Sequence, residues 1–184
     1  SVAVCLLFSF LNPSHELKIK EIMEKEFPEA SLSLSCEVLP QIREFYRMST
    51  TVINAYIAPV MSRYLGHLEG KLREIGVATP KLYIMQSNGG VSTFQGAGKK
   101  PVATVLSGPA GGVIACLGIS QRVDIKNIIT FDMGGTSCDV ALISDGTPVL
   151  TTQGRINQRP ICLPMLDIHT VSAGGGTIAR IDAV

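Results

Sequence analysis

Apolar residues in the first 39 positions form patterns that predict a strand, a helix and a second strand. Residues 1–11 are almost continuously apolar, which is typical of a buried strand of a parallel sheet. Residues 14–27 place apolar side chains at helical spacing, with Glu16 in the first turn, where a carboxylate favours the helix dipole. Residues 31–39 alternate serine and leucine, as a half-exposed strand does. We therefore expect a strand–helix–strand unit with parallel strands.

Helical spacing of apolar residues then continues over residues 41–75, which is long enough to bridge two α/β units. Pro59 is expected to kink or restart this helix, and Gly76 to cap its end. One stretch of the helix is unusually polar and contains Arg47, Ser49, Thr50, Thr51 and Asn54. The simpler interpretation of this polar patch is a solvated helix face, and the alternative is a patch that faces a cleft.

The clearest pattern in the chain is an apolar strand, a tight glycine turn and a second apolar strand over residues 128–143. Residues 128–131 are β-branched and aromatic, and residues 140–143 carry the chain back as a second apolar run. Between them, Gly134 and Gly135 allow backbone angles that a Cβ would forbid. The sequence therefore predicts a hairpin.

The turn of this hairpin carries groups that can bind phosphate. A Gly-Gly turn exposes backbone N–H groups that can hold phosphate oxygens, and the hydroxyls of Thr136 and Ser137 can add donors. Asp132, at the end of the first strand, can hold Mg²⁺ through water or orient an attacking water. The plainer interpretation is an ordinary hairpin in which Asp132 is a capping residue.

Between the long helix and this hairpin, the sequence predicts a strand, a turn and a helix. Residues 81–85 form a short strand, and the Asn-Gly-Gly run at residues 88–90 indicates either a hairpin turn or a cleft loop. Residues 96–100 are expected to form a flexible basic loop. The small residues that follow Ser107 predict a helix packed tightly against a neighbour, an interpretation that we favour over phosphate binding at its N-terminus.

The last third of the chain adds a third strand and a carboxylate–imidazole pair. Residues 148–156 predict the third strand of an antiparallel meander. Asp167 and His169 lie two positions apart, so in a strand they point the same way. Such a pair can act as a base, an acid or a metal ligand, or it can be a structural hydrogen-bonded pair. Residues 174–176 are three glycines, expected to form a loop into a helix that begins near Thr177.

Composition narrows the classes of function. The 184 residues are 46% hydrophobic and 17% charged with 18 glycines, which is typical of a globular protein with many tight turns. A net charge of +1 gives no indication of nucleic acid or an anionic membrane as partner, and the absence of tryptophan argues against surfaces that stack on bases. The five scattered cysteines have no zinc spacing and fit reduced thiols in a cytoplasmic protein. The apolar N-terminal run is too short to span a bilayer and lacks the basic flank of a signal peptide.

Four stretches in the same order resemble the hydantoinase A and 5-oxoprolinase family. They are REFYRMSTTVINAYIAPVM, LYIMQSNGGVST, FDMGGTSCDVALI and LDIHTVSAGGGTIA. The third is similar to the second phosphate hairpin of the wider superfamily of actin, sugar kinases and heat-shock chaperones. Two positions depart from the usual family wording, because Cys138 stands where the family has threonine and Ser172 where it has glycine.

The resemblance implies an α/β fold of the actin-like ATPase type, with two ribonuclease-H-like halves around a nucleotide cleft and a mixed sheet with antiparallel hairpins. In that fold, residues 1–39 would end the first half, residues 40–76 would form the linking helix, and residues 77–184 would start the second half with the phosphate hairpin. The first phosphate hairpin and a later adenosine-binding segment would lie outside these residues. We therefore expect an incomplete fold and little ATPase activity from the 184 residues alone.

The resemblance also implies a reaction, the ATP-dependent opening of a cyclic amide such as a hydantoin or 5-oxoproline. ATP and Mg²⁺ would be the cofactors, and a hydantoinase B-type subunit or domain the partner. Alternatives are an acetone or acetophenone carboxylase subunit, a nucleotide-binding regulator and a non-catalytic assembly domain. The site residues implied are catalytic Asp132, Asp167 and His169, with Asp132 also holding the metal, and nucleotide-binding Gly134, Gly135, Thr136 and Ser137.

Overall fold

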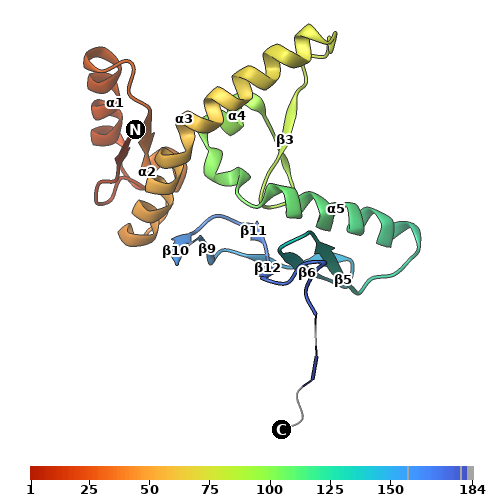
Figure 1. Ribbon diagram of the computed structural model, residues 1–184. Helices are drawn as coiled ribbons and strands as arrows, with labels where there is room; N and C mark the ends of the chain where they lie inside the picture. Colours follow the sequence, from red (N-terminus) through yellow and green to blue (C-terminus); the bar gives the residue numbers. More distant parts are fainter. Residues whose placement is uncertain (157, 179, 182–184) are drawn as a thin grey trace.

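The computed structural model describes residues 1–156, 158–178 and 180–181 and has a mixed α/β architecture. Figure 1 shows the long helix α3 (Glu44–Glu74) leading away from an N-terminal α/β unit, drawn in red. Helix α5 (Ser107–Arg122) runs through the lower half of the molecule, beside a set of short strands drawn in blue. Within the described residues, no helix combines the length and apolar character needed to cross a membrane.

The N-terminal unit is a parallel strand–helix–strand motif, as the sequence predicts. Strand β1 (Val2–Val4) pairs in parallel with β2 (Leu32–Leu34), and α1 (Ser14–Glu26) connects them. Both strands are shorter than expected, because the chain turns soon after β1 and the short helix α2 (Ser35–Val38) directly follows β2. The prediction that strand structure continues to residues 11 and 39 is therefore wrong.

Glu16 explains why both strands end early. This side chain is fully buried, and its Oε1 accepts hydrogen bonds from Leu6 N at 2.8 Å and Ser35 Oγ at 2.7 Å. Its Oε2 accepts from Cys36 N at 2.8 Å. Backbone groups that a longer sheet would pair are thus bound to α1 instead. Burial by itself would raise the pKa of Glu16, but these hydrogen bonds outweigh it and hold the pKa below its usual value.

Helix α3 forms where the apolar spacing predicts it. It runs without interruption through Pro59, so the chain does not restart there. Gly76 follows the helix with a φ of 89°, a left-handed conformation that commonly ends helices and that glycine adopts without strain. The prediction of Gly76 as the terminating residue is confirmed.

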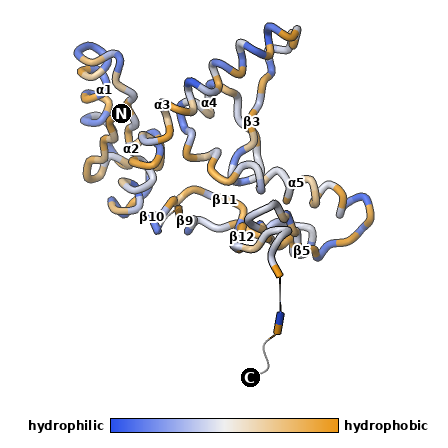
Figure 2. The backbone as a smooth tube through the Cα atoms, in the orientation of Figure 1, coloured by the Kyte–Doolittle hydropathy of each residue, from blue (hydrophilic) through white to orange (hydrophobic). Residues whose placement is uncertain are grey.

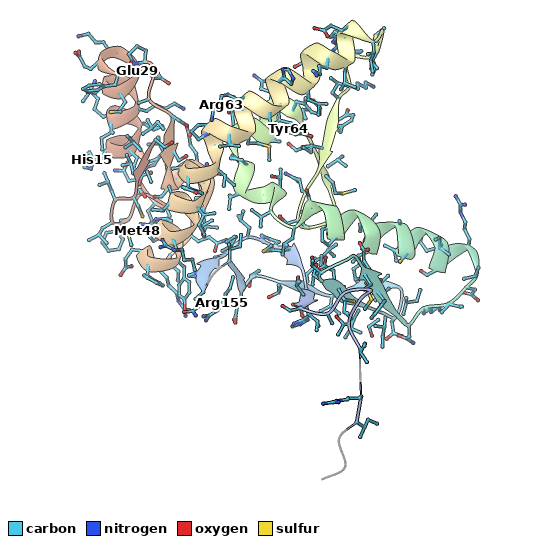
Figure 3. The ribbon with its side chains drawn as sticks, in the orientation of Figure 1. His15, Glu29, Met48, Arg63, Tyr64 and Arg155 are labelled. Carbon is cyan, nitrogen blue, oxygen red and sulfur yellow. The ribbon has the colours of Figure 1, made fainter. Side chains whose placement is uncertain are left out.

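In the first part of α3 the buried positions are polar, unlike those of an ordinary surface helix. Its buried positions include the polar residues Arg47, Thr50, Thr51 and Asn54, each at most 1% exposed. Its outer positions carry large apolar side chains, among them Met48, Val52, Tyr56, Val60 and Tyr64, of which Met48 and Tyr64 are labelled in Figure 3. The interpretation of the polar patch as a solvated face is therefore wrong, because these polar side chains bind groups inside the protein.

A β-hairpin follows α3. Strands β3 (Tyr83–Met85) and β4 (Val91–Thr93) are antiparallel, so the turn interpretation of the Asn-Gly-Gly run is confirmed. Ser87 in this turn is buried, and its hydroxyl donates to Ala103 O at 2.7 Å. The hydroxyl thus fastens the turn to the next segment of the chain.

The segment after the hairpin is helical, and the prediction of a flexible loop at residues 96–100 is wrong. It contains α4 (Phe94–Lys99) and the 3₁₀ helix η1 (Pro101–Thr104). Thr93 caps α4, because its Oγ1 accepts from Gly96 N at 3.1 Å, and Ala97 is fully buried. Capping and burial order a stretch whose glycines and lysines indicated a loop.

The predicted glycine hairpin consists of β5 (Ile128–Met133) and β6 (Cys138–Ser144), which are antiparallel. The other neighbour of β6 is β12 (Ile168–Val171), so the main sheet order is β12–β6–β5, with the two-residue β7 (Thr147–Pro148) also paired to β6. The expected three-strand meander is thus only partly right, because most of the third strand is replaced by β12.

Residues 149–166 form two further strand pairs instead of one long strand. Strand β8 (Leu150–Thr151) pairs with β11 (Met165–Leu166), and β9 (Gly154–Ile156) pairs with β10 (Arg159–Ile161). Figure 2 shows hydrophobic residues along the segment that leads from β10 to β11. This segment shares a hydrophobic core with α2 and η1, made of Val38, Leu39, Val102, Ile161, Leu163 and Met165. A second core, made of Ala110, Val113, Ala141, Ile143 and Leu166, joins α5 to the main sheet.

Candidate functional site

The tip of the β5–β6 hairpin is a four-residue turn, with Gly134 N donating to Ser137 O at 2.9 Å. Gly134, Gly135 and Thr136 are exposed and Ser137 is half-buried. The N–H of Gly134 is used within the turn, whereas the N–H groups of Gly135 and Thr136 have no partner among the described residues. The turn therefore presents free donors that can receive anionic oxygens.

Two carboxylates lie side by side below this turn. Asp132 on β5 is directly opposite Asp139 on β6, and a cross-strand pair points its side chains to the same face of a sheet. Thr170 Oγ1, on β12, donates to Asp139 Oδ1 at 2.6 Å and fixes its position. Asp139 was not among the site residues predicted from the sequence. A four-residue turn pairs positions seven apart, so the spacing of the two aspartates was a signal that could have identified it.

A pocket of about 210 Å³ lies between this carboxylate pair and helix α5. Gly112 brings the helix close, because a Cβ at this position would lie 3.8 Å from Asp132 Oδ2. The packing of small residues on α5 against the hairpin therefore forms one wall of the pocket. The lining is made of Pro109, Gly112, Val113 and Cys116 from α5, residues 130–132 and 139–141 from the hairpin, and Ile168 from β12.

The glycine loop at residues 174–176 braces the hairpin tip. Gly175 N donates to Gly134 O at 3.0 Å, and a Cβ on Gly174 would collide with Gly135 O. The loop was predicted, but not its contact with the hairpin, which joins segments about forty residues apart in a way that local patterns do not encode. A helix was expected to begin near Thr177, but residues 177, 178, 180 and 181 are not helical, and residues 179 and 182–184 lie outside the described part of the chain.

Asp167 and His169 face each other but lie apart from this pocket. His169 Nε2 is 3.6 Å from Asp167 Oδ1, and the His169 side chain is 78% exposed. Ile168 lines the pocket, so its neighbour His169 points to the opposite face of β12. The structure therefore brings Asp132 together with the glycine turn and with Asp139, but not with the Asp167–His169 pair.

Cys138, the departure from the family wording, is buried at the base of the turn. Burial and the neighbouring carboxylates of Asp139 and Asp132 raise the pKa of its thiol. The side chain is therefore a neutral thiol at neutral pH, and it adds no negative charge beside the carboxylate pair.

The two carboxylates of this site could hold a cation, to which the protein would supply few ligands. Among the described residues there is no group of three or more histidine, cysteine, aspartate or glutamate side chains that could enclose a metal ion. Two carboxylates beside free backbone donors instead suit an ion that keeps most of its water, as Mg²⁺ does when it binds together with a phosphate group.

The chain matches a known protein family and is similar in sequence to characterised proteins. The hydantoinase/oxoprolinase family model matches residues 47–184. The chain is 38% identical to caprolactamase subunit alpha of Pseudomonas jessenii, over 99% of this chain and 26% of that protein. It is also 38% identical to 5-oxoprolinase of Saccharomyces cerevisiae, over 97% of this chain and 14% of that protein. The chain thus spans about a quarter or less of the length of these relatives.

Two solved structures have the same arrangement of elements. The crystal structure of ATP-dependent caprolactamase from Pseudomonas jessenii superposes with a TM-score of 0.84 at 38% identity, over 98% of this chain and 26% of that one. The nucleotide-free structure of acetone carboxylase gives a TM-score of 0.81 at 29% identity, over 97% of this chain and 25% of that one.

Proposed function

Because this chain belongs to the hydantoinase/oxoprolinase family, we propose that it is part of an enzyme that uses ATP to open a cyclic amide. The observation that carries the proposal is the pocket in which two paired carboxylates lie below a glycine turn with free N–H groups. The names of two relatives, 5-oxoprolinase and ATP-dependent caprolactamase, support a cyclic amide as substrate. The chain spans about a quarter of the caprolactamase subunit, so we expect little ATPase activity from these 184 residues alone.

We propose that the fold is part of an actin-like ATPase fold. In this proposal residues 1–39 end the first ribonuclease-H-like half, residues 40–76 link the halves, and residues 77–184 begin the second half. The parallel β1–α1–β2 unit at one end of α3 and the antiparallel β12–β6–β5 sheet packed on α5 support this division.

We propose that Asp132 and Asp139 together hold Mg²⁺. Bound there, the ion would neutralise charge on the phosphate oxygens of ATP. The N–H groups of Gly135 and Thr136 would donate to those oxygens, while Gly134 shapes the turn and the Ser137 hydroxyl adds a further donor. Thr170 would keep Asp139 oriented toward the pocket through its 2.6 Å hydrogen bond.

The reaction needs ATP because an amide has a weakly electrophilic carbon and a poor leaving group. Transfer of the terminal phosphoryl group to the amide oxygen would make the ring carbon open to attack by a first water, after which the ring C–N bond breaks and leaves an acyl phosphate. A second water would then hydrolyse the acyl phosphate to the carboxylate and free phosphate. We propose Asp167 and His169 as the acid–base pair for the attack of water, at a position at the start of β12 outside the phosphate pocket to which the substrate ring would have to extend. The carboxylate can orient the imidazole, which then accepts a proton from water or donates one to the ring nitrogen.

We further propose a partner subunit of the hydantoinase B type and a cytoplasmic location. Caprolactamase subunit alpha and the acetone carboxylase beta subunit are both named as subunits, which supports a partner. All five cysteines are free, which fits a reducing compartment where ATP is available.

A second candidate function is carboxylation of a ketone. It is favoured by the 29% identity to the acetone carboxylase beta subunit of Xanthobacter autotrophicus and by the TM-score of 0.81 with acetone carboxylase. The same phosphate site would serve both reactions, because each activates a carbonyl oxygen with ATP. The identity to the caprolactamase subunit is higher, at 38%, and we therefore place cyclic amide hydrolysis first.

The test is ATP hydrolysis by the full-length protein that contains this chain, together with its partner subunit. ATP turnover is measured with 5-oxoproline, caprolactam, a hydantoin, or acetone with bicarbonate, and ring opening is followed by product analysis. Asp132→Asn should lower lactam-stimulated turnover by about 100-fold or more, because it weakens a charge that acts in the transition state. Asp145→Asn, in an exposed turn outside the pocket, is the matched control and should leave turnover unchanged.

Each alternative has its own outcome in this assay. Turnover stimulated by acetone and bicarbonate, and by no amide, would assign the carboxylase function. ATP binding without stimulation by any substrate would indicate a nucleotide-binding regulator. Equal activities of the Asp132→Asn and Asp145→Asn proteins would refute the proposed role of the carboxylate pair.

A further inference from the structure

The buried polar face of α3 holds distant segments of the chain through hydrogen bonds to their backbones. Arg47 donates to Leu6 O at 2.6 Å, in the N-terminal unit. Farther along the helix, Ser49 Oγ donates to Pro160 O at 2.8 Å, and Thr50 Oγ1 accepts from Cys162 N at 3.1 Å. One helix therefore fastens both the N-terminal unit and the strand segment that leads through β11 to β12.

Asn54 joins the N-terminal unit to the segment that contains α4 and η1 with a single side chain. Its Nδ2 donates to Ser33 Oγ, on β2, at 3.0 Å, and more weakly to Lys99 O at 3.5 Å. Its Oδ1 accepts from Val102 N, in η1, at 3.1 Å. Asn54 is 1% exposed, so water cannot replace a lost partner at low cost. One planar amide therefore links η1 to β2, beside the hydrophobic core that α2 shares with η1.

A short path leads from Val102 to the carboxylate pocket. Ala103, which follows Val102 in η1, accepts hydrogen bonds through its carbonyl oxygen from both the N–H and the hydroxyl of Ser87, each at 2.7 Å. Ser87 O in turn accepts from Leu166 N at 2.8 Å, directly before Asp167 and β12. On the other side, η1 is followed after two residues by α5, whose Gly112 adjoins Asp132. Both walls of the pocket are thus tied to the segment that Asn54 holds.

We infer that Asn54 is a positioning residue that couples the N-terminal unit to the Asp132–Asp139 pocket. Movement of β2 relative to η1 must break one of the two amide hydrogen bonds, so the two regions move together while Asn54 is intact. The amide does not titrate, so the coupling is independent of pH over the range in which the protein is folded. The consequence for the enzyme rests on the proposed function: Leu166, next to Asp167, and Gly112, next to Asp132, are both tied to η1, so ATP hydrolysis at Asp132 stays linked to ring opening at Asp167 and His169 while Asn54 holds η1.

The test removes, in the full-length protein, the hydrogen bonds by which Asn54 bridges Ser33 in β2 and Val102 in η1, which we call the Asn54 bridge. Asn54→Ala removes both bonds, and the milder Ser33→Ala removes the bond to β2 while Val102 N keeps its acceptor. Thr51→Val is the matched control, because Thr51 is as buried as Asn54 but its hydroxyl bonds to Arg47 O within α3 itself. Hydrogen–deuterium exchange of the backbone and the ratio of ATP hydrolysed to rings opened are measured for all three variants.

Both bridge variants should increase amide exchange in residues 107–116 and 166–171, which lie around the pocket, and Thr51→Val should not. The ratio of ATP hydrolysed to rings opened should rise in both by roughly 2- to 30-fold, the range by which mutations between two sites change their coupling, while the KM for ATP stays near that of the wild type. A merely structural role would lower the folded fraction without changing this ratio.

Exchange that increases only in residues 31–35 and 99–104 would overturn the inference, as would an unchanged ratio in an active enzyme. If the wild-type protein hydrolyses no ATP with any amide, the proposed function fails. The exchange measurement then decides by itself whether Asn54 couples the two regions.

Discussion

Replacing Glu16 by glutamine tests whether this buried carboxylate holds the N-terminal unit together. The substitution keeps the shape of the side chain but replaces one oxygen by an NH₂ group. Three donors, Leu6 N, Ser35 Oγ and Cys36 N, then compete for one remaining oxygen. At least one buried donor loses its acceptor, and the other bonds lose the assistance of the negative charge.

The loss can be estimated from these bonds. An unsatisfied buried donor costs about 1–3 kcal/mol, and the weakening of the remaining charged hydrogen bonds adds roughly 1 kcal/mol. We therefore expect Glu16→Gln to lower the free energy of unfolding by about 2–4 kcal/mol at pH 7. Glu24→Gln, at an exposed position on the same helix, should change it by less than about 0.5 kcal/mol.

The effect should also depend on pH, because the folded-state pKa of Glu16 lies below its usual value. A carboxyl group whose pKa is lowered by folding stabilises the protein above its unfolded pKa, about 4.3 for glutamate, and this stabilisation is lost as the pH falls through the folded pKa. Urea denaturation of wild type and both variants at pH 7 and in steps below pH 4.5 measures both effects. Equal denaturation midpoints for Glu16→Gln and Glu24→Gln at pH 7 would refute the argument.

Two further predictions concern a thiol and a glycine. Burial together with the hydrogen bond and charge of Glu16 raises the pKa of Cys36 to about 12. Cys36 should therefore alkylate very slowly at pH 8 and faster in Glu16→Gln, and peptide mass mapping measures both rates. Equal rates in the two proteins would contradict Glu16 as a cause of the raised pKa. Gly174→Ala should displace the hairpin tip, because its Cβ would collide with Gly135 O, and a titration of the full-length protein with MgATP should show weaker binding. Gly176 has open space around it, so Gly176→Ala should bind MgATP like the wild type in the same titration. Equal affinities of the two alanine variants would show that the loop does not support the tip.

The sequence predicted those features that local chemistry determines. The β5–β6 hairpin follows from two β-branched runs around a glycine turn, and α3 follows from its apolar spacing. The face that α3 buries was mispredicted, because the groups that satisfy Arg47 and Asn54 lie far away in the chain. Periodicity of apolar residues identifies a helix, but it does not reveal which distant backbone atoms form hydrogen bonds with the polar side chains of that helix.

The candidate site likewise contains features that could be predicted from the sequence and features that could not. Asp132 and the glycine turn could be recognised because they are adjacent in sequence. The brace at Gly174 and the bond from Thr170 to Asp139 could not, because both depend on β12 lying beside β6, a pairing across about thirty residues. The order of strands in a sheet is set by long-range packing, which a single sequence pattern does not encode.

The bonds from α3 to backbone atoms have a consequence for how this region can change in evolution. Oxygen and nitrogen atoms of the main chain are the same in nearly every amino acid, so the partners of Arg47 and Ser49 at Leu6 O and Pro160 O tolerate many side chains without loss of these contacts. The positions that bond through their N–H, Val102 and Cys162, have one forbidden replacement in common: proline, which has no hydrogen to donate. Most substitutions are therefore tolerated at the positions whose backbone atoms contact α3, whereas substitutions of the buried polar side chains of α3 are not.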